Sequence, residues 1–331
     1  MPFARLREAI RARAFPASSD PSAAALARAL VAAGGGDVVG IVFFGSRRTG
    51  AAFDPWSAYD FFVATRGYRG FYHALRAAGA LARPPLLHAA LNAVLPPSQL
   101  SFRATDAQGR ELRAKCSVIS LPALMREASW RRRDHFCLGR LFQPSEVLFA
   151  ADPASREQLL DALASAQALS YRWGRPWLPP RFAAAAYGRT LLRVSLSGEI
   201  RPEPAARADA LFEAQRAEQE PVHRILLAEL AAAGELVGSP DGRFDLARPA
   251  SAVERLRLRA YFGWSKGRAT ARWMKHVVTF EGWLDYILRK ARRHAGGEIV
   301  LAPHERRFPL LFLWPRLVRY LRDKERKGGS P

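Results

Sequence analysis

Two apolar runs, separated by a short polar segment, constrain the fold of this chain most strongly. Residues 38–44 (VVGIVFF) are β-branched, aromatic or small, and Gly45 and Ser46 follow them directly. Residues 59–65 (YDFFVAT) form the second run, in which Asp60 is the one charged residue. Runs of this length and composition predict two buried strands. A carboxylate within such a run is costly to bury unless it is paired or bound to a cation, so Asp60 calls for a chemical explanation.

The surrounding sequence predicts an α/β unit with a mixed sheet over residues 36–150. Helices are expected in the N-terminal residues 1–35, where Asp20-Pro21 is a typical start signal, and again at 69–81 and 121–136. Residues 97–105 and 111–120 alternate as strands do, and the polar turn between them predicts a strand pair.

The second half of the chain has a different character. At 331 residues the chain exceeds what one compact core usually spans. Alanine- and leucine-rich helices are expected at 155–173 and 208–236, and a short β-ribbon at 238–249. We therefore expect a mainly helical, winged-helix-like second domain over residues 151–264, followed by a basic, aromatic C-terminal region over residues 265–331.

The order strand, Gly-Ser, strand with aspartate is typical of the nucleotidyltransferase superfamily. Glycine allows close approach of the backbone, and amides with the Ser46 hydroxyl can bind phosphate oxygens beside Gly45. A carboxylate such as Asp60 can hold the Mg²⁺ that bridges the phosphates, and Asp54 could supply a second one. The structural alternative is a plain strand-ending turn next to a solvated edge carboxylate.

Several further segments, in order, resemble one branch of that superfamily. They are AYDFFV (58–63), Tyr72-His73-Ala74-Leu75, GRELRAKCSVIS (109–120), Trp130, GRLFQP (139–144) and SLSGEIR (195–201). The set resembles the mitochondrial translocator-assembly-and-maintenance proteins, which are phosphatidate cytidylyltransferases (CDP-diacylglycerol synthases). In that branch a single aspartate follows two apolar residues, as Asp60 follows Ala58 and Tyr59. The other interpretation of Ala58 is the loss of a metal ligand.

The resemblance implies a Mg²⁺-dependent enzyme that joins CTP to phosphatidic acid or another anionic lipid phosphate. Asp60 and Lys115 would be catalytic, and Lys115 is the only lysine before Lys266. An ammonium group suits a place beside a triphosphate, although a solvated strand-end lysine is the simpler alternative. The nucleotide-binding residues implied by the resemblance are Gly45, Ser46, Arg140, Ser197 and Arg201.

Three departures from the family pattern affect the acceptor and the base. The chain has GSRRTG where the family has GSGVF. Cys116 and Ser117 follow Lys115 where the family has Tyr-Gly, and Gln143 replaces the lysine of the GRLxKP motif.

The charge of the chain predicts an anionic partner. The formal net charge is +21, and residues 251–331 hold 19 Lys and Arg against 7 Asp and Glu. The apolar stretch at 308–315 is too short to span a bilayer but is flanked by arginines, as in segments that lie at a membrane interface. The residues expected to contact the membrane are Phe308, Leu311, Phe312, Trp314, Arg316 and Arg319. The alternative is that this stretch packs on the helical domain as core.

We therefore expect a peripheral enzyme on the cytoplasmic side of an anionic membrane. The two cysteines form neither a disulfide framework nor a zinc motif. The excess of arginine over lysine and the abundant alanine are typical of a GC-rich bacterium. Nucleic acid is the less favoured partner, because no RNA-binding signature is present. A nucleotidyltransferase with another acceptor (RNA, protein or a small molecule) and a non-catalytic nucleotide-binding relative remain as alternatives.

Overall fold

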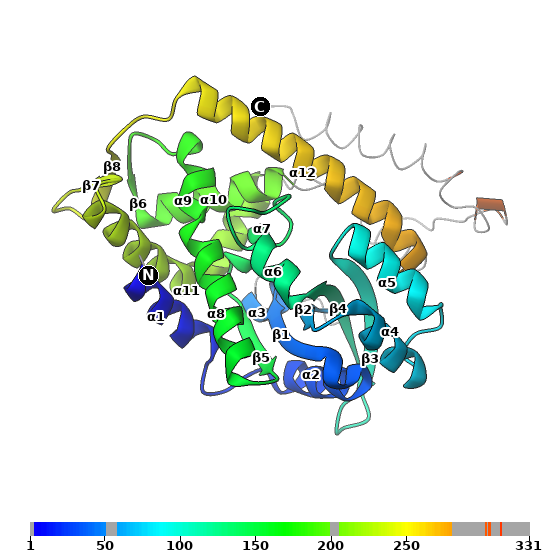
Figure 1. Cartoon of the computed structure of the whole chain (residues 1–331). Coiled ribbons are helices and arrows are strands. Elements are labelled where there is room, and N and C mark those ends of the chain that lie inside the picture. Colours follow the sequence, from blue (N-terminus) through cyan, green and yellow to red (C-terminus); the bar gives the residue numbers. More distant parts are fainter. Residues whose placement is uncertain are drawn as a thin grey trace. The chain divides into compact units, whose positions relative to one another are not determined.

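The computed structural model describes residues 3–50, 58–198 and 205–279, together with 302, 304, 305 and 312. The chain divides into two compact units, Met1–Arg272 and Trp273–Pro331. Every described strand, and every described helix up to α11, lies in the first unit, where α12 (Ala252–Thr279) also begins (Figure 1). None of the helices among the described residues is both long and apolar enough to cross a membrane.

A mixed five-stranded sheet forms the centre of the first unit, as the sequence predicts. Its strands are β1 (Val38–Phe44), β2 (Tyr59–Thr65), β3 (Ser98–Thr105), β4 (Glu111–Ser120) and β5 (Glu146–Ala150). Their order is β3-β4-β2-β1-β5, with β2 and β4 parallel and the other neighbours antiparallel. The expected pairing of β3 with β4 is confirmed.

Both faces of the sheet are covered, which explains why β1 and β2 are apolar apart from Asp60 and the buried Thr65. On one face, Phe43 and Phe61 pack with residues of α2 (Pro21–Gly34) and α4 (Tyr68–Ala77). On the other face, Phe44 and Phe62 share a core with further helices. These helices are α1 (Ala4–Ala14), α6 (Leu121–Glu127), α7 (Leu138–Leu141) and α8 (Pro153–Ala168).

The two N-terminal helices begin at defined caps. The Asp20 carboxylate accepts a hydrogen bond from the Ala23 amide at 2.8 Å, as expected for the cap of α2. At the start of α1, the amides of Arg5 and Leu6 donate to the carboxylate of Glu229, at 3.0 and 3.3 Å. A distant helix therefore satisfies the first amides of α1 and holds it in place.

The core on the α1 side of the sheet continues into the helical part of the chain. That part comprises α9 (Ser170–Gly174), α10 (Ala184–Ser197) and α11 (Ala205–Ala232) with a three-stranded sheet of β6 (Arg181–Ala183), β7 (Leu236–Gly238) and β8 (Arg243–Leu246). The antiparallel β7–β8 pair is the ribbon expected from the sequence. Remaining elements of the first unit are α3 (Ser46–Thr49), α5 (Pro85–Val94) and the short 3₁₀ turns Gly35–Asp37 and Arg175–Trp177.

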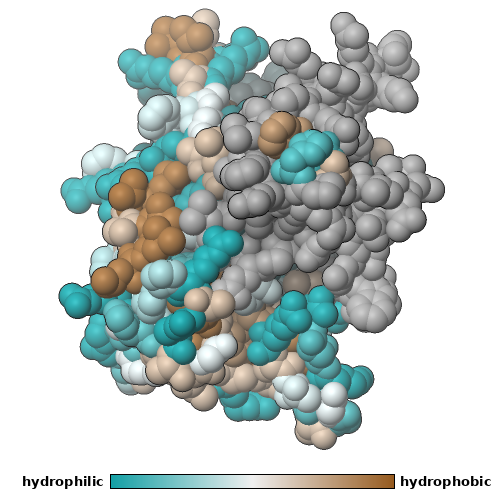
Figure 2. Space-filling view, turned by 90° about the vertical axis from the view of Figure 1, so that its right-hand side faces the viewer, coloured by the Kyte–Doolittle hydropathy of each residue, from teal (hydrophilic) through white to brown (hydrophobic). Residues whose placement is uncertain are grey.

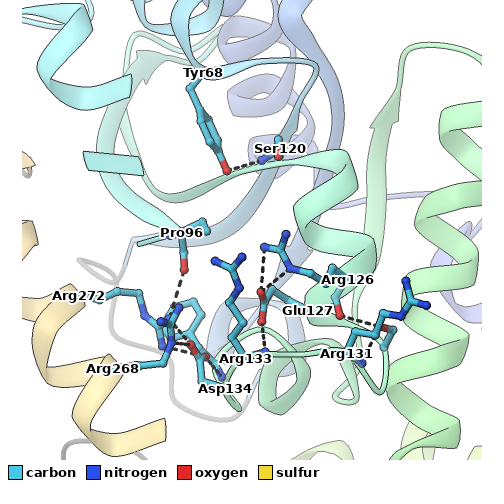
Figure 3. A network of polar contacts seen from close by, with 12 residues as sticks. Tyr68, Pro96, Ser120, Arg126, Glu127, Arg131, Arg133, Asp134, Arg268 and Arg272 are labelled. Atoms are coloured by element: carbon cyan, nitrogen blue, oxygen red, sulfur yellow. Dashed lines mark hydrogen bonds and ion pairs between the residues drawn. The ribbon is translucent and has the colours of Figure 1, made fainter. Parts of the chain in front are cut away.

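The helix expected over residues 121–136 is wrong beyond Glu127, where α6 ends. Side-chain hydrogen bonds replace the helical ones from this point. The Glu127 carboxylate accepts from the Arg133 amide at 2.9 Å, and the Ser129 hydroxyl donates to the Arg126 carbonyl at 2.7 Å (Figure 3). Helix α12 begins at Ala252 and continues past residue 265, where we expected the C-terminal region to begin.

Candidate active site

The register of three neighbouring strands brings two predicted site residues into one row. Asp60 of β2 is paired with Phe44, the last residue of β1, and on its other side with Lys115 of β4. Gly45 follows Phe44 directly, so Gly45, Asp60 and Lys115 lie at one end of the sheet. We refer to Gly45, Ser46, Asp60 and Lys115 as the strand-end site.

Gly45 is in close contact with the Asp60 side chain. Its φ angle is +88°, a conformation that residues with a side chain rarely adopt. A Cβ atom on Gly45 would lie 2.7 Å from Asp60 Oδ2 and 3.2 Å from Asp60 Cβ. Glycine is therefore required here for two reasons, the backbone conformation and the space that the carboxylate occupies.

The segment after Gly45 is fixed by its arginines. Ser46 opens the short helix α3, and Arg47 lies over the ring of Tyr59, with its guanidinium carbon 4.5 Å from the ring centre. Arg48 donates two hydrogen bonds to the Glu218 carboxylate, each at 2.9 Å. The backbone that was predicted from the sequence to bind phosphate is thus held by contacts on two sides.

Glu146 is a buried carboxylate near this end of the sheet that the sequence did not point to. It opens β5, is paired in register with Phe43, and lies 3.6 Å from Arg48. The sequence could have indicated it, because Glu146 directly precedes an apolar run, much as Asp60 lies within one. Its contact with Arg48 assigns it to positioning the turn after β1.

Positive charge lies on the face of the sheet that carries Asp60. Phe62, two residues after Asp60, meets the ring of Phe136 edge-on with 6.3 Å between centres. The guanidinium carbons of Arg140 and Arg272 lie 3.9 and 4.7 Å from the centre of the Phe136 ring. Phe136 therefore connects the strand of Asp60 with two cationic side chains.

Lys115 is half-buried in β4, between the buried residues Ala114 and Cys116. Burial raises the pKa of the Cys116 thiol, and the negative charge of Asp60 raises it further. Cys116 is therefore an uncharged core residue rather than a nucleophile, while the charge of Asp60 acts across the β2–β4 pair.

Two motif segments that are distant in sequence meet at their first residues, Gly139 and Ser195. A Cβ atom on Gly139 would lie 2.7 Å from the Ser195 hydroxyl, which is itself 3.1 Å from His135 Nε2. The contact is made by Ser195 and not by Ser197, whose hydroxyl donates to the Val194 carbonyl of its own helix at 2.8 Å.

His135 is a core residue in this arrangement. Burial lowers its pKa to about 3, and the charge of Arg132 contributes to that decrease. The imidazole is therefore neutral at physiological pH. It packs against the rings of Trp173 and Phe262, with 4.7 and 4.9 Å between ring centres.

In the helix containing Arg140, the polar side chains serve the local backbone. Arg140 donates to the Phe136 carbonyl at 3.0 Å, and the Gln143 amide donates to the Gly139 carbonyl at 2.7 Å. Gln143, which replaces a lysine of the family pattern, thus caps the end of α7.

A second charged cluster, not foreseen from the sequence, surrounds Asp134. Its carboxylate accepts from Arg272 at 2.7 and 3.0 Å and from Arg268 at 2.8 Å, and Arg272 also donates to the Pro96 carbonyl at 3.3 Å (Figure 3). Burial opposes ionisation of Asp134, but hydrogen bonds from Arg272 and Arg268 lower its pKa overall. We call Asp134, Arg268 and Arg272 the Asp134 cluster.

Most of the predicted membrane residues and two of the predicted site residues lie outside the described residues. They are Asp54, Arg201, Phe308, Leu311, Trp314, Arg316 and Arg319. Phe312 is described and is 45% exposed, with its ring 4.9 Å from that of His304. Among the residues that the structure describes, no three His, Cys, Asp or Glu side chains are grouped so that they could hold a metal ion.

Comparison with known proteins does not assign the chain to a family. No protein-family model matches the sequence, and no curated protein is significantly similar to it.

Proposed function

We propose that this protein is a Mg²⁺-dependent nucleotidyltransferase, and specifically a phosphatidate cytidylyltransferase. It would convert CTP and phosphatidic acid into CDP-diacylglycerol and pyrophosphate at a membrane surface. The observation that carries the proposal is the register of Asp60 with Lys115 at the end of β1, directly beside Gly45. A carboxylate, an ammonium group and a strand-ending glycine in one row suit the binding of a metal–triphosphate complex.

The donor set fits Mg²⁺. This ion is usually held by one or two carboxylates together with substrate phosphate oxygens and water. Asp60 is half-buried at the strand end and supplies one such carboxylate. Asp54 is the candidate for a second. When bound, Mg²⁺ would neutralise charge on the phosphates and make the α-phosphorus more susceptible to attack.

The remaining groups of the site would bind and orient the nucleotide. Amides and the hydroxyl of Gly45-Ser46 would donate to phosphate oxygens, and Lys115 would offset the negative charge that develops on the leaving pyrophosphate. Arg140 would add a positive charge on the face that carries Asp60. The attacking phosphate is already ionised near neutral pH, so no general base is needed, and catalysis is mainly positioning and charge neutralisation.

The lipid acceptor is supported by the resemblance of the ordered motifs and by the strongly basic charge. A net charge of +21 favours an anionic surface where phosphatidic acid would be concentrated. The winged-helix-like character of the helical part and the membrane contact of residues 308–319 belong to the same proposal.

The test is formation of CDP-lipid from labelled CTP, Mg²⁺ and phosphatidic-acid liposomes, with ATP, GTP and UTP in parallel. A product that forms with CTP and not with the other three supports the proposal. Product with RNA, protein or a small molecule in place of the lipid would support nucleotidyl transfer but identify a different acceptor. No product with any acceptor, combined with no nucleotide binding, would reject the enzyme.

A further inference from the structure

Helix α5 (Pro85–Val94, PLLHAALNAV) presents its apolar side chains outward and its polar ones inward. His88 and Asn92, one turn apart, are buried. Leu86, Leu87 and Val94 are 55%, 40% and 77% exposed, and Ala90 and Ala93 between them are also exposed. This is the reverse of an ordinary surface helix, in which the apolar stripe faces the core. We call Leu86, Leu87, Ala90, Ala93 and Val94 the α5 face.

The inner contacts of α5 show that this orientation is built into the fold. The Asn92 amide donates to the Tyr72 hydroxyl at 3.0 Å and to the Val118 carbonyl at 3.1 Å. The ring of His88 lies 5.1 Å from that of Tyr72. Turning the helix to bury its leucines would break these hydrogen bonds. The Tyr72 hydroxyl and the Val118 carbonyl would then face apolar side chains without the hydrogen bonds from Asn92. The leucines are therefore held outward by specific contacts.

Within residues 61–105, which include α5, every charged side chain is basic. One of them, Arg103, lies 3.7 Å from Glu111 of β4. The helix itself has no charged residue, and no acidic residue occurs anywhere in residues 61–105. That stretch contains five arginines, Arg66, Arg69, Arg76, Arg83 and Arg103. Arg83 directly precedes α5, and Arg76 of the neighbouring helix α4 donates to the Leu81 carbonyl at 3.0 Å, in the loop that leads to α5. The side of the molecule on which α5 lies in Figure 1 shows a large apolar patch next to hydrophilic atoms (Figure 2).

We propose that the α5 face is a membrane-docking surface that inserts into the headgroup region of an anionic bilayer. Exposed leucine and valine would enter the acyl boundary while arginines on the same stretch of chain contact anionic headgroups, as in helices that lie in a membrane interface. A helix of 10 residues is too short to span a bilayer, so it would lie along the surface. The inference rests on the proposed function for its lipid partner, and it assigns docking to a part of the folded first unit that the sequence did not indicate.

The experiment is flotation of the full chain with vesicles of phosphatidylcholine alone and of phosphatidylcholine with phosphatidic acid. We compare the natural chain with the triple variant Leu86→Ser, Leu87→Ser, Val94→Ser. Because all three side chains are exposed, the fold should persist, which circular dichroism and thermal unfolding verify. We expect binding to the anionic vesicles to fall by at least about tenfold, given the apolar area removed from the interface. Arg83→Gln should reduce binding less and make it less sensitive to salt.

The matched control is Val237→Ser, which removes an apolar side chain that is 57% exposed on β7. It should bind vesicles as the natural chain does. Unchanged binding of the triple variant would overturn the proposal, and so would equal binding of the natural chain to neutral and anionic vesicles. If the triple substitution abolishes a dimer in analytical ultracentrifugation but spares vesicle binding, a second copy of the chain covers the α5 face and the proposal is wrong.

The same assay separates this inference from the proposed function. Asp60→Asn should float with anionic vesicles as the natural chain does, since Asp60 is remote in sequence from the α5 face and belongs to the strand-end site. Vesicle binding that depends on α5, without any CDP-lipid formation, would support the docking surface and contradict the proposed enzymatic activity. CDP-lipid formation that is unaffected by the triple variant on vesicles would keep the activity and reject the docking surface.

Discussion

Asp60 and Asp134 are both carboxylates in apolar surroundings, and the molecule treats them in opposite ways. Asp134 is 3% exposed and is held by two arginines of α12, of which Arg272 is itself only 2% exposed. Asp60 lies half-buried at the end of a strand, against the backbone of Gly45 and in register with a lysine.

The difference indicates two roles for a buried charge. A carboxylate enclosed by arginines is already neutralised, so its hydrogen bonds stabilise the contact between α12 and the loop before α7. A half-buried carboxylate beside a glycine turn at the end of a strand is placed where it can serve as a ligand of a metal–phosphate complex. Substitutions at the two sites should therefore separate activity from stability.

The largest effect is expected from Asp60→Asn, which keeps the size of the side chain and removes its charge. Turnover should fall by about a thousandfold or more, equivalent to about 4 kcal/mol of transition-state stabilisation. The free energy of unfolding, measured in urea, should change less than in a variant of the buried Asp134, because Asp60 is only half-buried and asparagine keeps its size. Retained turnover in this variant would reject the strand-end site.

Asp134→Asn should give the opposite result. Removing one partner of a buried ion pair leaves Arg272 uncompensated and costs about 3 kcal/mol of unfolding free energy. The exposed pair of Asp241 with Arg181 is the control, and Asp241→Asn should change stability little. Similar stability of the two variants would contradict the structural role of the Asp134 cluster.

We also expect Asp134→Asn to change how the free energy of unfolding depends on pH in acid. Because the pKa of Asp134 is lowered in the folded state, its contribution is present above the unfolded-state pKa near 4 and is lost as the pH falls through the lower folded value. Asp134→Asn should therefore flatten the decrease in stability on the acid side of about pH 4, in urea titrations at a series of pH values.

Alanine substitutions at two glycines with positive φ should separate the cost of backbone strain from the cost of a steric clash. Gly45 and Gly50 have φ angles of +88° and +67°, but a Cβ atom would clash with Asp60 only at Gly45 and would meet nothing within 4 Å at Gly50. Gly50→Ala should cost about 1 kcal/mol of unfolding free energy from strain. Gly45→Ala should cost about 2–3 kcal/mol and also reduce nucleotide binding. Equal behaviour of the two variants would show that the Gly45–Asp60 contact has no special role.

The smallest of these effects is expected at Lys115. Lys115→Ala should reduce turnover by about 10- to 100-fold, and Lys115→Arg should recover part of it, since the charge returns with a different shape. Arg113→Ala is the control, because it removes a positive charge from the same strand where Arg113 is paired with Glu111. If both alanine variants lose activity equally, Lys115 contributes only to the general charge of the surface.

The central sheet and the strand-end site could be predicted from sequence, because the patterns that indicate them are local. The runs at residues 38–44 and 59–65 and the strand pair around residues 106–110 fall where periodicity and turn residues indicate. Because Gly45 directly follows one strand and Asp60 lies near the start of the next, antiparallel pairing brings them together.

Much of what could not be predicted depends on contacts between distant segments. Helix α5 was missed because its pattern is inverted, with His88 and Asn92 inside and leucines outside, so that it lacks the usual amphipathic signal. The end of α6 at Glu127 is set by nearby side chains, in a hydrogen-bond pattern that helical periodicity does not indicate. The pairing of Asp134 with Arg268 and Arg272 joins residues up to 138 positions apart. No local pattern carries that information.

The most direct test of the strand-end site is equilibrium binding of CTP to the natural chain and to Asp60→Asn, each with and without Mg²⁺. We predict that the natural chain binds CTP in a Mg²⁺-dependent manner and that Asp60→Asn loses this dependence while it remains folded. Binding that is equal in the two proteins, or that is indifferent to Mg²⁺, would contradict the assignment of Asp60 as the ligand that joins metal and nucleotide to the sheet.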